Sequence, residues 1–190
     1  MELTEAEPHV SDSDAVRSAI GQGTNSYTPV QLSRYVSTIS NGGTCYDLTL
    51  VDKVSDPSKD NKIQNNKANV RNELDIKSST MDAIRKGMYM VVNSGSLKTV
   101  FQKVPVKVAG KTGTAQISAN EPNHALFVSY APYQSPKISV TVVIPNAFTS
   151  SNAASLASSI YQYYFDKKAR KNLLKKSASS PVSNSGRVAD

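Results

Sequence analysis

Residues 104 to 116 read VPVKVAGKTGTAQ, an apolar alternation that continues into small, hydroxylated and glycine residues around a single lysine, Lys111. Alternation with a period of two predicts a β-strand, which we place at about 107–117. Glycine weakens a strand unless another group approaches its backbone closely, so Gly110 and Gly113 indicate a strand whose backbone is kept bare. A glycine bulge at an edge strand, with an exposed lysine, explains the same residues equally well.

Two more segments of the same kind follow this strand. The sequence ALFVSYA predicts a strand at 125–131 and KISVTVVIP predicts one at 137–145, with the turn signals ANEPN and PYQSP before and between them. Connections this short favour an antiparallel meander. A helix is then expected at about 152–168, with apolar positions that can cover the sheet and basic residues that suit its C-terminal dipole.

Two helices are expected before the Lys111 strand. The first begins at a capping box made by Thr28, Pro29 and Gln31. Its expected apolar face is Leu32, Tyr35, Val36 and Ile39. The second begins near Ser79 and presents an apolar face made of Met81, Ile84, Met88 and either Val91 or Val92. Between the helices the sequence IQNNKANVRNELD is polar enough to be loop. The predicted fold class is therefore α+β, with a three-stranded antiparallel sheet covered by helices.

Composition limits the classes of function. The chain has 190 residues, 38% of them hydrophobic, and a formal net charge of +7. Acidic residues crowd the start and Lys and Arg crowd a stretch near the end, so we expect a poorly ordered acidic leader at 1–18 and a basic, Ser-rich disordered tail at 169–190. A nucleic-acid contact by the basic stretch is the least favoured hypothesis, because no aromatic or glycine-rich interleaving accompanies it.

Metal and membrane chemistry have little support in the sequence. Cys45 is the one cysteine, and His9 and His124 are far apart, so no metal site and no cofactor are expected. The longest apolar runs, such as VTVVIP, are far too short to span a bilayer. We therefore expect this sequence to carry neither an export signal nor a membrane anchor.

Three stretches in a fixed order resemble the class B penicillin-binding proteins. AIGQGTNSYTPVQLSRYVSTISNGG at 19–43 resembles their Gly-Gln-Gly, Thr-Pro-x-Gln-Leu and Asn-Gly-Gly pattern, and MDAIRKGMYMVVNSG at 81–95 resembles their Gly-Met-x-x-Val-Val segment. The third stretch is the Lys-Thr-Gly element and the two strands after it. The resemblance covers about Ala19 to Phe165.

The resemblance implies a fold and an activity. It makes 19–168 the C-terminal part of a transpeptidase domain, an incomplete β-lactamase-like fold whose three strands belong to a sheet of five in the family. In that family a serine attacks the D-Ala-D-Ala amide of a peptidoglycan stem peptide, or a β-lactam, on the extracytoplasmic face of a bacterial membrane. The partner it implies is the N-terminal remainder of the domain. The strand at 138–144 would then be an unpaired apolar edge.

The resemblance also implies roles for single residues. The ammonium of Lys111 attracts the terminal carboxylate and helps to move protons, while Thr112 and Thr114 offer it hydroxyl groups. The backbone N–H of Thr114 is one oxyanion-hole donor, and Gly113 lets the substrate lie against the strand. A possible cleft wall is made by Gly21, Gln22 and Gly23, which a plain turn before a helix explains equally well.

One family motif is missing. No Ser-x-x-Lys occurs in the sequence, and the two Ser-x-Asn triplets, at 118–120 and 150–152, come after Lys111 rather than before it. We interpret both triplets as chance, and we expect this chain to be an inactive fragment of a D,D-transpeptidase when alone. The alternative is a non-catalytic half-domain that binds peptidoglycan or a partner protein.

Overall fold

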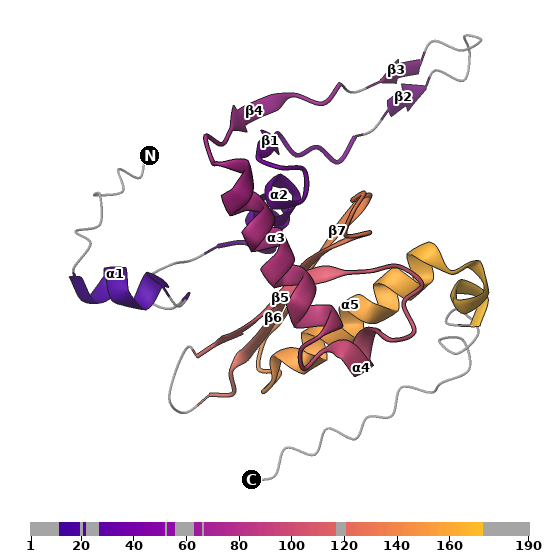
Figure 1. Cartoon of the computed structure of the whole chain (residues 1–190). Coiled ribbons are helices and arrows are strands. Elements are labelled where there is room, and N and C mark those ends of the chain that lie inside the picture. Colours follow the sequence, from indigo (N-terminus) through magenta and orange to yellow (C-terminus); the bar gives the residue numbers. More distant parts are fainter. Residues whose placement is uncertain are drawn as a thin grey trace.

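The computed structural model describes residues 12–19, 21, 27–51, 53–55, 63–65, 67–116 and 121–172. In the described residues, helices and strands follow one another in groups along the chain (Figure 1). Their bounds are α1 Asp12–Ala19, α2 Pro29–Ser40, β1 Thr44–Tyr46, β2 Lys53–Ser55, β3 Ile63–Asn65, β4 Val70–Glu73, α3 Ser78–Asn93, α4 Lys98–Phe101, β5 Ala109–Ala115, β6 His124–Ala131, β7 Ile138–Ile144 and α5 Ser150–Phe165.

The predicted antiparallel meander is confirmed as a three-stranded sheet in the order β5-β6-β7. Its register places Lys111 opposite Val128, and Val128 opposite Thr141. The pairing of β5 with β6 is continuous from Ala109 to Ala115, so the bulge that we considered for this strand is wrong. The central strand β6 is paired on both sides, and its hydrogen bonds to β5 hold β5 in place.

Helix α5 covers one face of the sheet. Phe127, Val140 and Val142 are buried on this face and pack with the alanines of α5, Ala153, Ala154 and Ala157, which are fully buried. Small side chains let the helix backbone approach the sheet closely. The hydroxyl groups of Ser129 and Tyr161 lie 2.9 Å apart inside this layer, and burial raises the pKa of Tyr161, so its phenol stays protonated at neutral pH.

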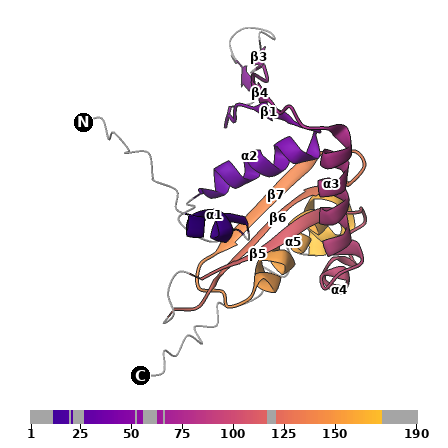
Figure 2. The ribbon, with the colours of Figure 1, turned by 60° about the vertical axis from the view of Figure 1, so that its left-hand side comes forward.

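Helices α2 and α3 cover the opposite face, as Figure 2 shows. This second core contains Val36, Ile39, Met81, Met88, Ala109 and Tyr130. Arg85 of α3 donates from Nε to the Tyr130 hydroxyl at 3.3 Å and from Nη2 to the Tyr133 carbonyl at 3.3 Å. Burial raises the pKa of Tyr130, and the hydrogen bond from Arg85 partly offsets this rise.

The predicted start of α2 is confirmed, but its predicted apolar face is too wide. The Gln31 N–H donates to Thr28 Oγ1 at 3.3 Å, and the Thr28 N–H donates to Gln31 Oε1 at 2.8 Å, which completes the capping box. Tyr35 is 61% exposed, and Ile84 on α3 is 39% exposed. Both expectations were wrong because, within this sheet, α2 packs mainly on β6 and β7 and α3 packs mainly on β5, so each helix buries only the side chains along that line of contact.

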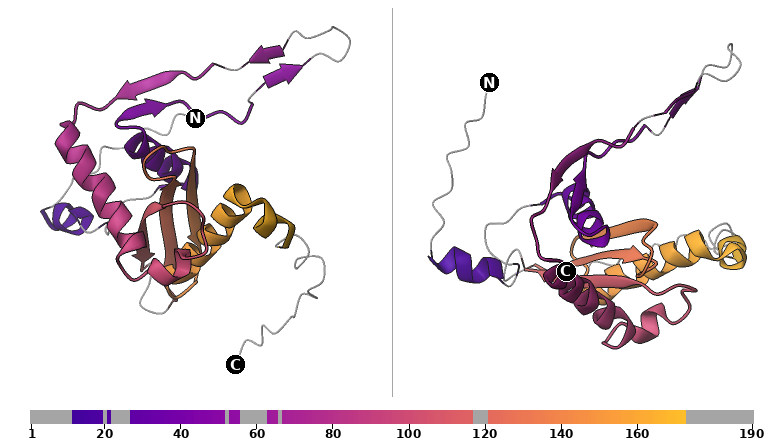
Figure 3. Two further views of the ribbon diagram at one scale, coloured as in Figure 1. Left: turned by 45° about the vertical axis from the view of Figure 1, so that its right-hand side comes forward. Right: turned by 45° about the horizontal axis from the view of Figure 1, so that its top comes forward.

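The segment between α2 and α3 forms a projecting arm, where we expected loop for its second half. Strand β1 pairs antiparallel with β4, and β2 pairs antiparallel with β3, so two short ribbons follow one another away from the sheet (Figures 1 and 3). Asn41 holds the base of the arm, because its side chain donates to the Thr44 carbonyl at 2.7 Å and accepts from the Thr44 N–H at 2.9 Å. The arm is formed by pairing between strands, and the polar composition of the segment does not predict that pairing.

The ends of the described chain are helical where disorder was expected. Helix α1 occupies 12–19 and overlaps the segment 1–18 that was predicted as a leader, and the helical residues 167–172 overlap the start of the predicted tail at 169. Arg170 donates to the carbonyl groups of Tyr163 and Tyr164 at 2.9 and 3.1 Å, which suits the C-terminal end of α5. Residues 1–11 and 173–190 lie outside the described residues.

Candidate functional site

The Lys-Thr-Gly strand β5 forms one edge of the sheet. Its inner side pairs with β6, and no strand of the described chain pairs with its outer side. The backbone groups along an unpaired edge can accept an extended peptide as an added strand. The element that sequence analysis singled out is therefore placed where a peptide could reach it.

The pleat of β5 divides the predicted site residues between the two faces of the sheet. Lys111 and Gly113 lie on the face that α2 and α3 cover, and Thr112 and Thr114 lie on the face of α5. We expected Lys111 and both threonines to point at one carboxylate. Because successive side chains alternate, a single ligand can reach both sets only from the open edge of β5.

The two glycines of β5 stand at their positions for different physical reasons. A Cβ atom on Gly110 would lie 2.5 Å from Cζ of Phe127 and 2.9 Å from Cβ of Ser129, both of which are fully buried. A Cβ atom on Gly113 would lie 3.3 Å from Cβ of the half-buried Leu126. The group that approaches Gly110 is therefore the protein core, whereas packing explains Gly113 much less and leaves it suited to a ligand.

Lys111 is an exposed ammonium group without a nearby carboxylate in the described structure. Its Nζ donates to the Thr112 carbonyl at 2.9 Å. The one ion pair among the described residues joins Arg71 to Asp47 at 3.5 Å, on the projecting arm. An unneutralised cation at the edge of β5 provides an attractive potential for an anionic ligand.

The excess of positive charge in the segment that contains β5 is a feature that the search for motifs missed. Residues 83–120 contain six Lys and Arg residues and no Asp or Glu, and they include most of α3, α4 and all of β5. The signal was present in the sequence as the spacing between Asp82 and Glu121. The described part of the chain has no group of three His, Cys, Asp or Glu residues that could bind a metal ion. The site is therefore cationic and is built without metal ligands from the described residues.

Asn93 is a second residue whose role only the structure shows. Its Nδ2 donates to the Tyr89 carbonyl at 2.9 Å and to the Val108 carbonyl at 2.8 Å. The first bond is within α3 and the second joins the end of this helix to the residue before β5. Asn93 thus fixes where the Lys-Thr-Gly strand begins.

The remaining predicted site residues are not brought to β5 by the described structure. Gly21 is exposed, has a φ of +77°, and has no neighbouring atom within 4 Å of an added Cβ atom, which suits a turn. Gln22 and Gly23 lie outside the described residues, as does the triplet at 118–120. The triplet at 150–152 starts α5, where Asn152 donates to the Ala147 carbonyl at 2.9 Å. That capping contact gives this triplet a structural role.

Comparison with known proteins identifies the family. Residues 3–162 match the family described as the penicillin binding protein transpeptidase domain, and the chain belongs to that family. The match begins inside the segment expected to be a leader. The peptidoglycan D,D-transpeptidase MrdA of Haemophilus influenzae is 31% identical over 176 residues, 82% of this chain and 26% of the relative. Penicillin-binding protein H of Bacillus subtilis is 33% identical over 141 residues, 67% of this chain and 20% of the relative.

Solved structures confirm the fold class. Penicillin-binding protein 2B of Streptococcus pneumoniae has a TM-score of 0.72 at 29% identity, over 82% of this chain and 28% of that one. The imipenem acyl-enzyme of penicillin-binding protein A from Mycobacterium tuberculosis has a TM-score of 0.65 at 26% identity, over 75% of this chain and 32% of that one. The chain spans about a fifth to a quarter of the length of the two curated relatives.

Proposed function

We propose that this chain is the Lys-Thr-Gly part of a peptidoglycan D,D-transpeptidase domain, and that the edge of β5 binds the terminal carboxylate of a D-Ala-D-Ala stem peptide or of a β-lactam. The observation that carries the proposal is Lys111, an exposed cation on an unpaired strand edge, with no carboxylate paired to it in the described structure. Membership of the family supports the reaction class.

The proposed chemistry divides the work among four residues of β5. The Lys111 ammonium attracts the carboxylate and assists proton transfer, and Thr112 and Thr114 supply hydroxyl groups at the strand edge. Gly113 lets the peptide backbone lie close to β5. The Thr114 N–H is assigned to the oxyanion hole by the family pattern, and a donor of this kind contributes about 3 kcal/mol to transition-state stabilisation.

A peptide titration tests the carboxylate site. We expect a peptide that ends in D-Ala-D-Ala to shift the NMR signals of residues 111–114, because its carboxylate meets Lys111 at the open edge. The same peptide with a C-terminal amide should bind at least about tenfold more weakly, because it lacks the charge. Equal affinity for the acid and the amide, or signal changes confined to other residues, would contradict the proposal.

The acylating serine is proposed to come from outside these 190 residues, since no Ser-x-x-Lys occurs among them. A fluorescent penicillin should therefore leave no covalent label on this chain alone. Mass spectrometry of the intact chain after incubation measures this directly. A stoichiometric penicilloyl adduct on any serine of the chain would overturn the proposed division of labour, and a whole penicillin-binding protein treated in parallel shows that the reagent is active.

The proposed partner is the N-terminal remainder of the domain, at the extracytoplasmic face of a bacterial membrane as the family implies. Strand β7 supports it, because in the described part of the chain β7 pairs only with β6, although Val140 and Val142 are buried under α5. An outer strand with one unpaired side is a site at which a sheet can be extended. No helix in the described ranges is long and apolar enough to cross a membrane.

The non-catalytic half-domain is the second candidate, and the missing Ser-x-x-Lys favours it. The same titration separates the two candidates. If neither the acid nor the amide peptide binds this chain by itself, a free-standing binding module is excluded, and so is carboxylate binding by the β5 edge without the remainder of the domain.

A further inference from the structure

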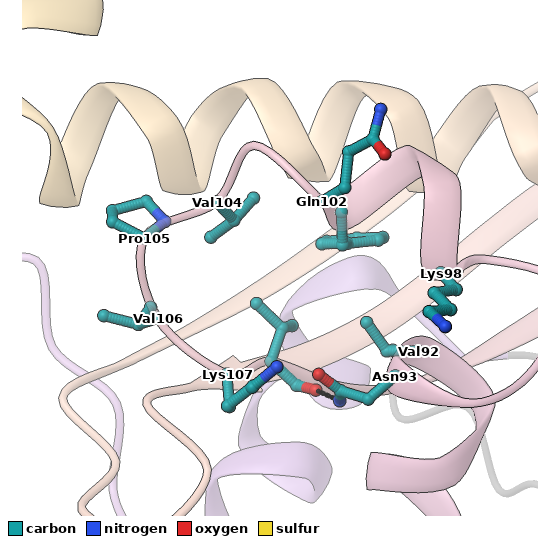
Figure 4. A pocket seen from close by; sticks show the side chains of 10 residues that line it. Val92, Asn93, Lys98, Gln102, Val104, Pro105, Val106 and Lys107 are labelled. Carbon is teal, nitrogen blue, oxygen red and sulfur yellow. Dashed lines mark hydrogen bonds between the residues drawn. The ribbon is translucent and has the colours of Figure 1, made fainter.

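A concave site lies beside the segment that leads into β5. It is a cavity of about 370 Å³ between the C-terminal end of α3, helix α4 and the segment 104–108. Figure 4 shows Val104, Pro105 and Val106 on one side of it, Val92, Asn93 and Lys98 on the other, and Lys107 between the two groups. Its size is within the range of pockets that hold small organic ligands.

The floor of this cavity is apolar. Val92, Phe101 and Val108 of the core under α5 lie behind it and are almost fully buried, and the exposed Pro105 and half-buried Val106 provide the apolar surface that a ligand can reach. A surface of this kind favours a ligand with a hydrocarbon portion, because the transfer of apolar groups from water to an apolar surface is favourable. The ligand is therefore expected to have an apolar body that enters the cavity.

The rim of the cavity is polar and cationic. Lys98 and Lys107 are exposed and line the cavity, and no Asp or Glu lines it. The Nδ2 atom of Asn93 donates to two backbone carbonyl groups, so the attraction for an anion comes from the two lysines and not from this amide. Two ammonium groups without a lining carboxylate select an anion.

We propose that this cavity binds a small organic anion, a carboxylate or a phosphate monoester on a short apolar body, with its charged end between Lys98 and Lys107. The site is distinct from the β5 edge, because Lys111, Thr112 and Thr114 do not line the cavity. It goes beyond the proposed transpeptidase function and does not depend on it. The Asn93 amide, which joins α3 to Val108, is at the boundary of the cavity and reports its occupancy.

The test is an NMR titration of the whole chain with three probes, hexanoate, hexyl phosphate and neutral hexanamide. We expect both anions to shift the Asn93 side-chain amide and the backbone signals of 104–108, with dissociation constants of about a millimolar. Hexanamide should bind at least about tenfold more weakly. Comparison of the two anions shows whether the site takes a carboxylate or a phosphate. If hexanamide binds as well as the anions, or if no probe shifts these signals, the proposal is wrong.

Variants locate the charge that the anion meets. The double substitution Lys98→Gln and Lys107→Gln should lower the affinity for hexanoate about tenfold, because both changes remove ammonium groups from the rim. Lys103→Gln is the matched control, since Lys103 is exposed, lies directly before the segment 104–108 and does not line the cavity. An equal loss in the control would show general charge attraction and overturn the site. The signals of 111–114 distinguish this binding from binding at the β5 edge.

Discussion

Gly110→Ala is expected to destabilise the protein by about 1–3 kcal/mol, as overpacking of a filled core does, and Gly110→Val is expected to abolish folding. The reason is steric, because an added Cβ atom would lie 2.5 Å from Cζ of Phe127 and 2.9 Å from Cβ of Ser129. Both neighbours are fully buried under α5, so neither can move into solvent. Urea unfolding followed by circular dichroism measures the change in the free energy of unfolding.

Gly113→Ala is the matched control for this prediction. Its Cβ atom would meet Leu126 at 3.3 Å, and Leu126 is half-buried with room to adjust. We expect a change below about 1 kcal/mol, because a small shift of Leu126 relieves the contact and alanine lowers the entropy cost of ordering this position. Equal destabilisation at the two positions would show that the core does not require Gly110 in the way that we describe.

Lys111→Gln is expected to reduce the affinity for a D-Ala-D-Ala peptide about tenfold or more and to remove the preference for the acid over the amide. The effect follows from the loss of the cation at the edge of β5, because in the described structure no carboxylate forms an ion pair with Lys111. For the same reason, added salt should weaken binding to the native chain and have little effect on the variant. Isothermal titration at low and high salt measures all three quantities.

Lys137→Gln is the control for that experiment, because Lys137 is an exposed lysine that precedes β7, away from β5 in the sheet order. An equal loss of affinity in this control would assign the effect to net charge and contradict a specific role of Lys111. Lys111 is itself exposed, and its Nζ donates to the carbonyl of the neighbouring Thr112. We therefore expect the Lys111 variant to keep the native stability, so a loss of binding would not reflect a loss of folding.

The stretch without carboxylates links these predictions to the cavity beside the segment 104–108. Lys98, Lys107 and Lys111 all belong to the stretch without carboxylates at 83–120. Their separate roles are tested by changing each one, because pairs that do not contact one another usually have additive effects. Binding of the stem peptide should respond to Lys111, and binding of hexanoate to Lys98 and Lys107.

Local patterns predicted the parts of the fold in which neighbours in sequence interact. The capping box of α2 was predictable because its hydrogen bonds join residues close in the chain, and the three strands were predictable because they alternate clearly and are separated by short connections with turn residues. The arm was partly missed, since the pairing of β1 with β4 joins segments some 25 residues apart and most residues of β4 are polar. Tyr35 and Ile84 were assigned to apolar faces that the narrow sheet is unable to cover.

The sequence by itself determined the α+β class, the order of the strands and the identity of the Lys-Thr-Gly element, because alternation, turn residues and motif spacing are local properties of the chain. Tertiary structure alone decided which glycine belongs to the core and which to the ligand edge. It did so because Phe127 reaches Gly110 through cross-strand packing, while the pleat turns Gly113 to the other face. It also placed Asn93 against Val108, a contact between segments that no spacing rule connects.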